Sequence, residues 1–512
     1  MILAPYSTRF AANGMVCTVS DVATESGIAA LRDGGTAVDA AIAAGAVLAV
    51  THQHQCGLGG DLLALVHRDG NSRPFALNAS GRAGSGADPD RLRAARHTTM
   101  PPTGEASCAT VPGCVDGWLA LHQRFCRLPL SRLLAPARRY AAEGFAASPS
   151  LAAACEQLAG VDGADDYTAH GPTYSGQLLR RSGVARTLES IARDGRRGFY
   201  EGEFGHALIE LGGGEFSAGD FARDQADWVE PLAVEAFGRR VWSLPPNSQG
   251  YLLLASAAIA SGLELPEPDD PGWAHLLIEC SRVAAADREM VWHEASSGEE
   301  LIGAPRIAAM RERIGDRRLP ERSPDPVPGG TTGICVVDDD RTAISMLQSN
   351  YLGWGSLLFV PGPKIALHNR GSSFSLEPGH PAEYRPGRRP PHTLAPLVVT
   401  DGDGALESVL ATRGGDLQPQ ILLQLLARVY GAGQSPAQAL AAGRWALVGS
   451  EVELEGQASE RWFDGLIARG HRVHGQPAFS EQFGEAQLIV RRPEHLAAAS
   501  DPRSPTWAVG AL

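Results

Sequence analysis

The sequence predicts an α+β protein in which helices pack on antiparallel sheet. Helical patterns with clear start and stop signals fill most of the first 325 residues. A stretch rich in Pro and Gly follows at residues 318–330, and two β-hairpin patterns and two helices come after it. We therefore expect a helix-rich first part and a second part that contains sheet and helices.

The composition is that of a globular protein with a large core. The chain has 512 residues, of which 44% are hydrophobic and 20% charged. The net charge of −13 and the lack of a Lys/Arg-rich run argue against nucleic-acid or anionic membrane partners. The longest apolar run, residues 40–50, is shorter than the roughly 20 residues that a membrane span needs. The N-terminal sequence does not have the pattern of a secretory signal, so we expect a cytoplasmic protein.

Eight cysteines are spaced singly and form no C-x-x-C pair, so reduced structural thiols are expected. In THQHQC, two interpretations of His52, His54 and Cys56 remain open: metal ligands or polar loop contacts. Loop contacts are favoured, because helical metal ligands stand at i+3 or i+4 and no second ligand pair follows. No metal or organic cofactor is expected.

Helices in the first part are marked by their ends. Residues 20–35 begin with Ser-Asp and stop at a Gly pair, and residues 36–50 read as a buried Ala-rich helix. A glycine-rich turn and a strand follow within residues 56–70, and residues 128–145 form an amphipathic helix closed by Gly144. The region 151–325 reads as mostly helical, with Pro/Gly breaks.

The linker RLPERSPDPVPGG, residues 318–330, has four prolines and cannot hold a helix or a central strand. After it, GICVVD and TAISMLQ form one hairpin pattern, and LAPLVVT and ALESVLAT form another. PQILLQLLARVYGAG and SERWFDGLIARG read as helices, and AQLIVRR as a further strand. There is no G-x-S-x-G sequence, which disfavours a standard α/β-hydrolase.

The junction Gly330-Thr331-Thr332 permits two interpretations. One is a turn that leads into an ordinary strand, because threonine favours strands. The other is a nucleophile that becomes a chain terminus: an N-terminal threonine has a hydroxyl and an α-amine of pKa about 7.7–8.0 that can accept its proton. Cleavage would come from attack of Thr331 Oγ on the Gly330 carbonyl, and a glycine enters distorted conformations at low cost.

Motifs along nearly the whole chain resemble, in the same order, those of the γ-glutamyltranspeptidase family of N-terminal-nucleophile (Ntn) hydrolases. They include ATESGIAALRDGGTAVDAAIAA, CGLGGD, TVPGCVDGW, LPLSRLLAPARRYAAEGF, SLPPNSQG, SNYLGWGS, RPPHTLAP and TRGGDLQPQ. The resemblance implies a four-layer αββα sandwich made as one proenzyme. It also implies autocatalytic cleavage at Gly330 and Thr331 into a large subunit, residues 1–330, and a small subunit, residues 331–512. The two would remain associated as a heterodimer and together form one Ntn-hydrolase domain.

The resemblance also implies catalytic roles. Thr331 matches the family nucleophile and would supply the α-amine base. Ser349 matches a hydroxyl residue that hydrogen-bonds the nucleophile and assists maturation. Gly414 and Gly415 match the pair whose N–H groups form an oxyanion hole; a tight turn between strand and helix is the structural alternative, and both can hold.

Several positions depart from the family pattern. Gly333 replaces the His of the Thr-Thr-His motif, and His392 and Thr393 occupy the positions of the serine pair that binds the glutamyl carboxylate. Ser373 stands at the position of the acidic residue that binds the substrate ammonium, and Arg370 at a neighbouring amide position.

Arg82 lies near, but out of register with, the family arginine of the N-terminal half. With a negative group lost and Arg370 gained, the pattern predicts an acyl group with a carboxylate and no amine, as in the family branch that contains oxamate amidohydrolase. Structural salt bridges of Arg370 or Arg413 are the alternative.

Two other functions remain open: a γ-glutamyl hydrolase or transpeptidase acting on glutathione-like substrates, and an unprocessed, catalytically silent relative. The expected partner is a small-molecule amide, with water or an amine as acceptor. The sequence leaves further association into a homo-oligomer open.

Overall fold

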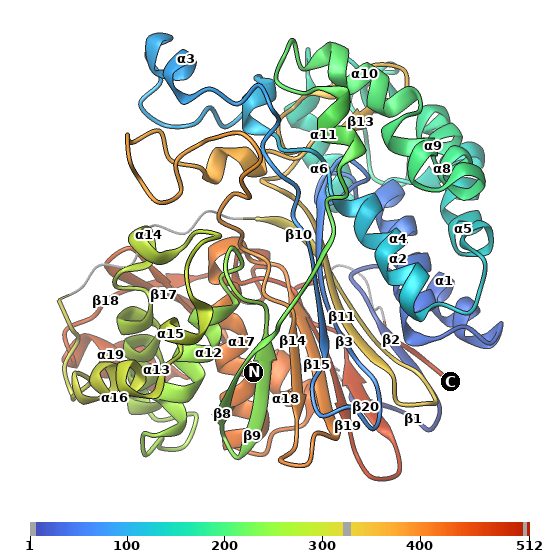
Figure 1. Cartoon of the computed structure of the whole chain (residues 1–512). Coiled ribbons are helices and arrows are strands. Elements are labelled where there is room, and N and C mark those ends of the chain that lie inside the picture. The colour runs from blue at the N-terminus through green and yellow to red at the C-terminus, as the bar shows by residue number, and fades with distance from the viewer. Residues whose placement is uncertain (1–6, 321–328, 505–508) are drawn as a thin grey trace.

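Two antiparallel sheets lie face to face at the centre of the molecule, and helices cover the outer face of each (Figure 1). This computed structural model describes residues 7–320, 329–504 and 509–512. The layers confirm the four-layer αββα sandwich and the α+β class expected from the sequence.

Within the described residues, each of the two sheets has seven strands, and every neighbouring pair runs antiparallel. The first sheet runs in the order β8 (Leu232–Ala236), β9 (Arg239–Ser243), β14 (Leu397–Thr400), β15 (Leu406–Thr412), β19 (Ala486–Arg491), β20 (Leu496–Ala499) and β1 (Arg9–Ala11). The second runs in the order β21 (Val509–Ala511), β2 (Met15–Cys17), β10 (Gly330–Val337), β11 (Ala343–Tyr351), β3 (Asp61–His67), β4 (Phe75–Ala79) and β7 (Asp227–Val229).

The alternation of side chains along β10 links the layers. Cys335 and Val337 lie in the core between the two sheets. Ile334 and Val336 lie in the core under the helices on the other face. Because successive strand residues point to opposite faces, a strand buried on both sides must be apolar throughout, as GICVV is.

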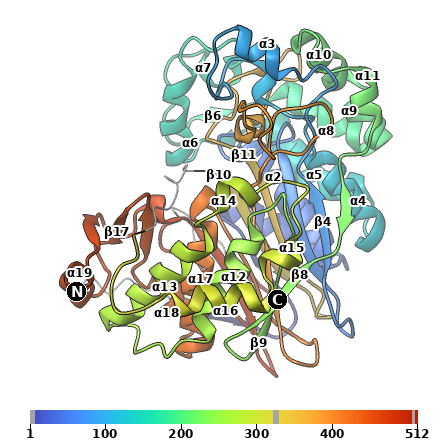
Figure 2. The same ribbon diagram turned by 60° about the vertical axis from the view of Figure 1, so that its left-hand side comes forward.

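Helices fall into two groups, one on each outer face (Figures 1 and 2). The group over the β10–β11 sheet includes α1 (Asp21–Arg32), α2 (Ala37–Thr51), α4 (Cys114–Phe125), α5 (Leu130–Glu143) and α8 (Ser182–Asp194). The group over the other sheet includes α12 (Gly250–Ser261), α13 (Pro271–Ala284), α16 (Ala304–Glu312), α17 (Gln418–Leu426) and α19 (Glu460–Ala468). A small sheet of β16 (Trp445–Val448), β17 (Glu451–Glu455) and β18 (Arg472–Gln476) flanks the second group.

Helix α2 is the buried Ala-rich helix expected from the sequence, and every one of its residues is buried. Its small side chains allow close packing under β11: a Cβ at Gly45 would lie 2.7 Å from Gln348 Oε1. Thr36 and Asp39 form a capping box at its start. The Asp39 carboxylate also accepts hydrogen bonds from the backbone N–H groups of Arg127 and Leu128, each at 3.0 Å.

Both predicted hairpins are confirmed as β10–β11 and β14–β15. The described part of the region 151–325 is mostly helical, as expected, but it also contains the unexpected strands β7, β8 and β9, within residues 227–243, which extend both sheets at their edges. Gly330 is already part of β10, although the linker was expected to hold no strand. Linker residues 321–328 lie outside the described residues.

All eight cysteines are free thiols, and seven of them are buried. Among the described residues, no helix combines the length and apolar character needed to cross a membrane.

Replacing Asp39 by Ala is expected to lower the free energy of unfolding by about 2 kcal/mol or more. The buried backbone N–H of Thr36 and the part-buried N–H groups of Arg127 and Leu128 would lose their acceptor; an unpaired buried donor costs about 1–3 kcal/mol, and a part-buried one less because water can reach it. Urea unfolding in a Thr331→Ala background, where the chain is expected to stay intact, measures the effect. Asp33→Ala is the control: this carboxylate contacts Arg132 at the surface, so a change below about 1 kcal/mol is expected. Equal effects of the two substitutions would contradict the capping argument.

Candidate active site

Thr331 lies at the start of β10, a central strand, directly opposite Ser349 on β11. Both side chains are fully buried, and their hydroxyl oxygens are 3.1 Å apart. The pairing register shifts between Gly330 and Thr331, so regular β-structure is interrupted at the peptide bond that the sequence marks for cleavage.

The Ser349 hydroxyl joins the Thr331 hydroxyl to the carbonyl before it. Ser349 Oγ donates to the Gly330 carbonyl oxygen at 2.7 Å. Ser349 Oγ in turn accepts a hydrogen bond from the Tyr351 N–H at 2.9 Å. Because the Ser349 proton is used on Gly330, Thr331 Oγ–H is the donor in the contact between the two hydroxyls. The arrangement polarises the carbonyl that Thr331 would attack.

Arg370 holds Ser349 in place. Its guanidinium is fully buried and donates to Ser349 Oγ at 3.3 Å, to Thr393 Oγ at 3.0 Å and to Asp61 Oδ2 at 3.0 Å. It also stacks on the Tyr351 ring, 4.1 Å from the ring centroid. The structural salt bridge considered for Arg370 is therefore present.

Asp61 is the centre of this buried polar cluster. Its Oδ2 accepts from His392 Nε2 at 2.8 Å, and His368 Nδ1 lies 3.5 Å away. Burial opposes ionisation, but the hydrogen bond from His392 and the charge of Arg370 hold the pKa of Asp61 well below its usual value. Burial, reinforced by the charge of Arg370, lowers the pKa of His392 to about 4. His392 is therefore neutral at pH 7, and the Arg370 charge is balanced by Asp61.

Gly414 and Gly415 form the turn between β15 and α17, with φ of 142° and 54°. The tight turn is thus observed. It lies against the residue before Gly330: a Cβ built on Gly329 would be 2.8 Å from Gly415 Cα and 3.0 Å from Gly415 N. Gln249 holds the turn beside the cluster, because its side-chain amide donates to the carbonyls of Gly415 and Thr393, at 2.9 and 2.6 Å.

Ser373 ends the short helix η3 (Arg370–Ser373) that carries Arg370, and its side chain is partly buried. It lines a groove of about 740 Å³ together with Met100, Trp292 and Pro391. The groove is thus lined in part by residues that lie close to Arg370 and His392 in the sequence.

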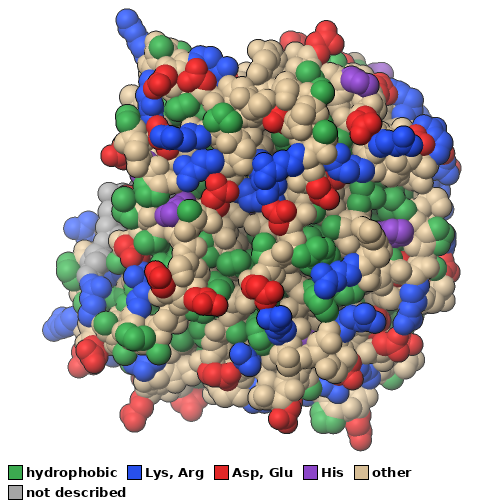
Figure 3. Space-filling view, viewed as in Figure 1, with side chains coloured by type: hydrophobic (Ala, Val, Ile, Leu, Met, Phe, Trp, Pro, Cys, Tyr) green, Lys and Arg blue, Asp and Glu red, His purple; other side chains and the backbone are tan. Residues whose placement is uncertain are grey.

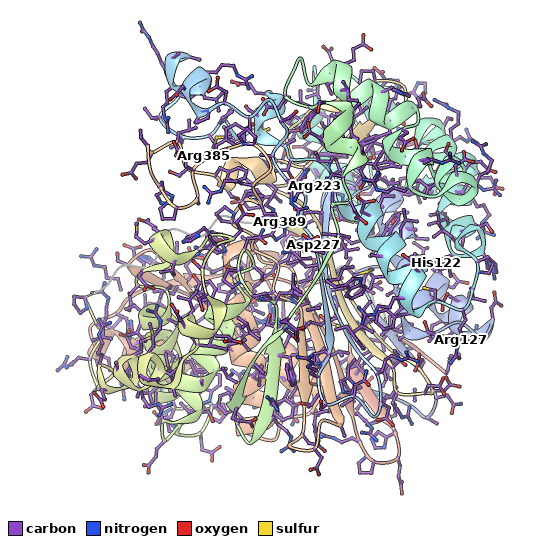
Figure 4. The ribbon with its side chains drawn as sticks, viewed as in Figure 1. His122, Arg127, Arg223, Asp227, Arg385 and Arg389 are labelled. Carbon is purple, nitrogen blue, oxygen red and sulfur yellow. The ribbon has the colours of Figure 1, made fainter. Side chains whose placement is uncertain are left out.

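Arg82 lies outside the cluster. It forms an ion pair with Asp227 of β7, which Arg389 also contacts, at 2.8 Å. Figure 4 shows Asp227 next to Arg389, in agreement with their ion pair, and Figure 3 shows basic side chains as a band across this part of the surface. On the sheet, Thr331 pairs with Ser349 and Ser349 with Asp61, whereas Arg82 follows the end of the next strand outward, β4, and pairs with Asp227 of the edge strand β7. Arg82 is therefore left out of the acyl site proposed below.

Sequence reasoning did not single out Asp61 or Gln55. With its amide oriented by its neighbours, Gln55 donates to the Thr331 carbonyl at 3.3 Å and accepts from Arg413 at 2.7 Å. Arg413 also pairs with Glu481 and Glu485, and burial raises the pKa of Glu485 to about 7. CGLGGD, the motif that ends in Asp61, was the available signal for Asp61.

One group of described residues, His275, Glu279 and His471, has the spacing of metal ligands. The two imidazoles already hydrogen-bond each other at 2.8 Å, and Glu279 pairs with Arg282. His52 and His54 belong to no such group among the residues described.

A buried threonine that begins a central strand of an αββα sandwich, with its hydroxyl linked to the preceding peptide carbonyl, is the arrangement of the N-terminal-nucleophile hydrolases. Residues 23–511 match the gamma-glutamyltranspeptidase family, and the chain belongs to this family. It is accordingly an enzyme, a hydrolase or acyltransferase.

Known relatives extend over the whole chain. The glutathione hydrolase-like YwrD proenzyme of Bacillus subtilis is 32% identical, over 97% of this chain and 98% of the relative. The oxamate amidohydrolase proenzyme of Klebsiella pneumoniae is also 32% identical, over 99% and 100%. The crystal structure of a cephalosporin acylase from Bacillus halodurans has 33% identity and a TM-score of 0.92, covering 100% of this chain and 99% of that one.

His392 is expected to make the protein more sensitive to acid. Its pKa is about 4 when folded and about 6.5 when unfolded, so below pH 6.5 the unfolded state binds the extra proton. The His392 contribution to stability is complete above pH 6.5 and falls by about 1.4 kcal/mol per pH unit between pH 6 and 4.5. In the Thr331→Ala background, where the chain is expected to stay intact, His392→Asn should flatten this fall in pH-dependent urea unfolding, and the exposed His206→Asn should not. Identical slopes for this background with and without His392→Asn would contradict the assignment of a neutral His392.

Proposed function

We propose that this chain is an autoprocessing N-terminal-threonine amidohydrolase that works through an acyl-Thr331 intermediate. The observation that carries the proposal is the Ser349 hydroxyl, which contacts both Thr331 Oγ and the Gly330 carbonyl oxygen. An ordinary turn followed by a strand would not require this pair of contacts. In the proposed scheme, the nucleophile, its target and a donor to the target oxygen are assembled before cleavage.

Processing would begin when Thr331 Oγ attacks the Gly330 carbonyl carbon. The Gly330–Thr331 C–N bond breaks, the amide nitrogen takes the hydroxyl proton, and Gly330 becomes an ester on Thr331 Oγ. Water then hydrolyses the ester, which releases the Gly330 carboxylate and leaves Thr331 with a free amine. The products are the pieces 1–330 and 331–512.

Turnover would use the same atoms on a substrate amide. The freed α-amine of Thr331 accepts the hydroxyl proton as Oγ attacks, and passes it to the leaving amine. The N–H groups of Gly414 and Gly415 are proposed to bind the oxyanion, because this turn lies against the residue next to the scissile carbonyl. Water, or an amine acceptor, then releases the acyl group.

The acyl group is proposed to lack an α-ammonium. Ser373 replaces the expected acidic partner, and the Asp61 carboxylate is fully buried behind Arg370 and His392. Because Asp61 and Arg370 are paired with each other, this cluster offers a substrate neither a carboxylate for an ammonium group nor an unpaired cation. A substrate carboxylate would therefore meet hydrogen-bond donors rather than an unpaired arginine. Oxamate-like amides fit this description, and the 32% identity to an oxamate amidohydrolase supports them.

A second candidate is hydrolysis or transfer of γ-glutamyl groups, supported by the similar identity to a glutathione hydrolase-like proenzyme. It would need an ammonium partner from outside the cluster of Asp61, Arg370 and His392.

The purified chain is expected to separate on a denaturing gel into pieces of about 35 and 19 kDa, estimated from 54.0 kDa in total. Thr331→Ala should leave one band near 54 kDa, because the attacking oxygen is gone. Ser349→Ala should slow cleavage by about 100-fold, because a donor to the developing oxyanion is lost.

Ser345→Ala serves as the matched control, since Ser345 is a buried serine on the same strand that contacts Leu410 O instead. It should be cleaved at the wild-type rate. A folded wild-type chain that never yields an N-terminal Thr331, or a Ser349→Ala chain cleaved as fast as Ser345→Ala, would contradict the proposed scheme.

Oxamate is expected to be hydrolysed with a kcat/KM at least about tenfold above that for γ-glutamyl-p-nitroanilide, because no carboxylate meets the ammonium of the latter. Ammonia release and nitroaniline absorbance measure the two reactions. Turnover of the glutamyl compound alone would favour the second candidate.

A further inference from the structure

We propose that the acyl site is a slot with backbone walls that excludes acyl groups branched at the carbon next to the reacting carbonyl. The substrate class is therefore amides of unbranched acyl groups. This inference rests on the proposed function, since it uses the acyl-Thr331 ester. It adds a limit on the shape of the acyl group, which the contacts of the polar cluster alone do not set.

The precursor itself marks where an acyl group goes. During processing, the Gly330 carbonyl carbon becomes bonded to Thr331 Oγ, as the carbonyl carbon of any substrate would. Gly330 Cα then corresponds to the first carbon of the acyl chain, and Gly329 lies further along the same path. The space around these two glycines is thus a template of the acyl site.

That space is closed at Gly330 on the side where an L-residue carries its side chain. A Cβ on Gly330 would lie 3.0 Å from Gly353 N and 3.3 Å from both Gly353 Cα and Gln55 Cα. These atoms all belong to backbone, which cannot rotate away as a side chain can. Gly330 does not have the left-handed conformation, so space is what excludes a side chain here.

The path stays narrow one residue further from Thr331. A Cβ on Gly329 would meet Gly415 Cα at 2.8 Å, Gly415 N at 3.0 Å and Tyr351 O at 3.4 Å. Gly353 and Gly415 thus form the wall at successive positions, and neither has a side chain that could move away to make room. The position of Gly415 also puts the proposed oxyanion-hole turn in contact with the acyl chain.

The slot explains how one site could suit both candidate substrates yet spare ordinary peptides. Oxamate has a flat carboxylate, and a γ-glutamyl group a CH2, next to the reacting carbonyl. A peptide bond after any L-amino acid other than glycine has a side chain at this carbon, on the closed side. Such peptides are excluded by backbone contacts rather than by charge.

Self-cleavage tests the slot without any added substrate. Gly330→Ala should slow the appearance of the 19 kDa piece at least about tenfold, because the new methyl group meets the backbone of Gly353 and Gln55. Gly402→Ala is the control: it lies in the β14–β15 turn with nothing within 4 Å of its Cβ, so cleavage should be unchanged. Thermal melting of both chains establishes that they are folded. A folded Gly330→Ala chain cleaved at the wild-type rate would overturn the proposal.

Isomeric substrates give the second arm. The probes are mono-4-nitroanilides of glutaric acid, of its 2-methyl derivative and of its 4-methyl derivative, numbered from the anilide carbonyl. The 2-methyl isomer has the configuration that places its methyl group as in L-alanine. Its kcat/KM should fall about 10- to 100-fold below that of the 4-methyl isomer, which has the same mass and charge.

The outcomes separate the two proposals. Equal turnover of the two methyl isomers would overturn the slot and leave the amidohydrolase intact. A wild-type chain that neither cleaves itself nor hydrolyses any amide would overturn the proposed function. If the chain cleaves itself but leaves all three anilides intact, the test is self-cleavage: slower cleavage of Gly330→Ala than of Gly402→Ala supports the slot, and equal rates overturn it.

Discussion

The pairing of β10 with β11 is the constraint on which the rest of the site depends. It sets Thr331 opposite Ser349, and the pairing of β11 with β3 sets Ser349 opposite Asp61. Side chains directly opposite each other point to the same face, so three residues far apart in sequence form one polar row. A slip of one residue would turn the row to the opposite face. The two apolar cores on either side of β10 oppose such a slip, because they require its alternating residues to stay where they are.

The buried ion pair of Arg370 and Asp61 connects this row to the loops above it. Burying two charges costs free energy that their attraction only partly returns, so such pairs are weak evidence of stability. Here the guanidinium also holds the hydroxyls of Ser349 and Thr393, and the carboxylate holds His392. The pair is therefore better understood as a device for positioning: it fixes Ser349, which contacts Thr331, together with Thr393 and His392, and the charges of Arg370 and Asp61 balance each other.

Local patterns were enough to predict elements whose signals lie within a few residues. The helix α2 and both hairpins followed from periodicity and turn residues. Strands β8 and β9 were missed because a short strand near the edge of a sheet shows too few alternating apolar and polar residues to be distinguished from its helical surroundings. Asp61 was missed for another reason: its partners Arg370 and His392 are 309 and 331 residues away, and no window of sequence contains them. The nucleophile came from family resemblance, and its contacts came only from the fold.

The strands of the two expected pieces alternate within the sheets. In the second sheet, β2 lies between β21 and β10, and β3 follows β11, so residues before and after position 330 share hydrogen-bonded edges. Before a cut, these strands find one another within a single chain. Afterwards, a denatured molecule would have to reassemble from two separate polypeptides, and its recovery would depend on protein concentration. A maturation of this kind would make folding a one-time event: the active form would persist because it unfolds slowly, with little prospect of renaturation in dilute solution.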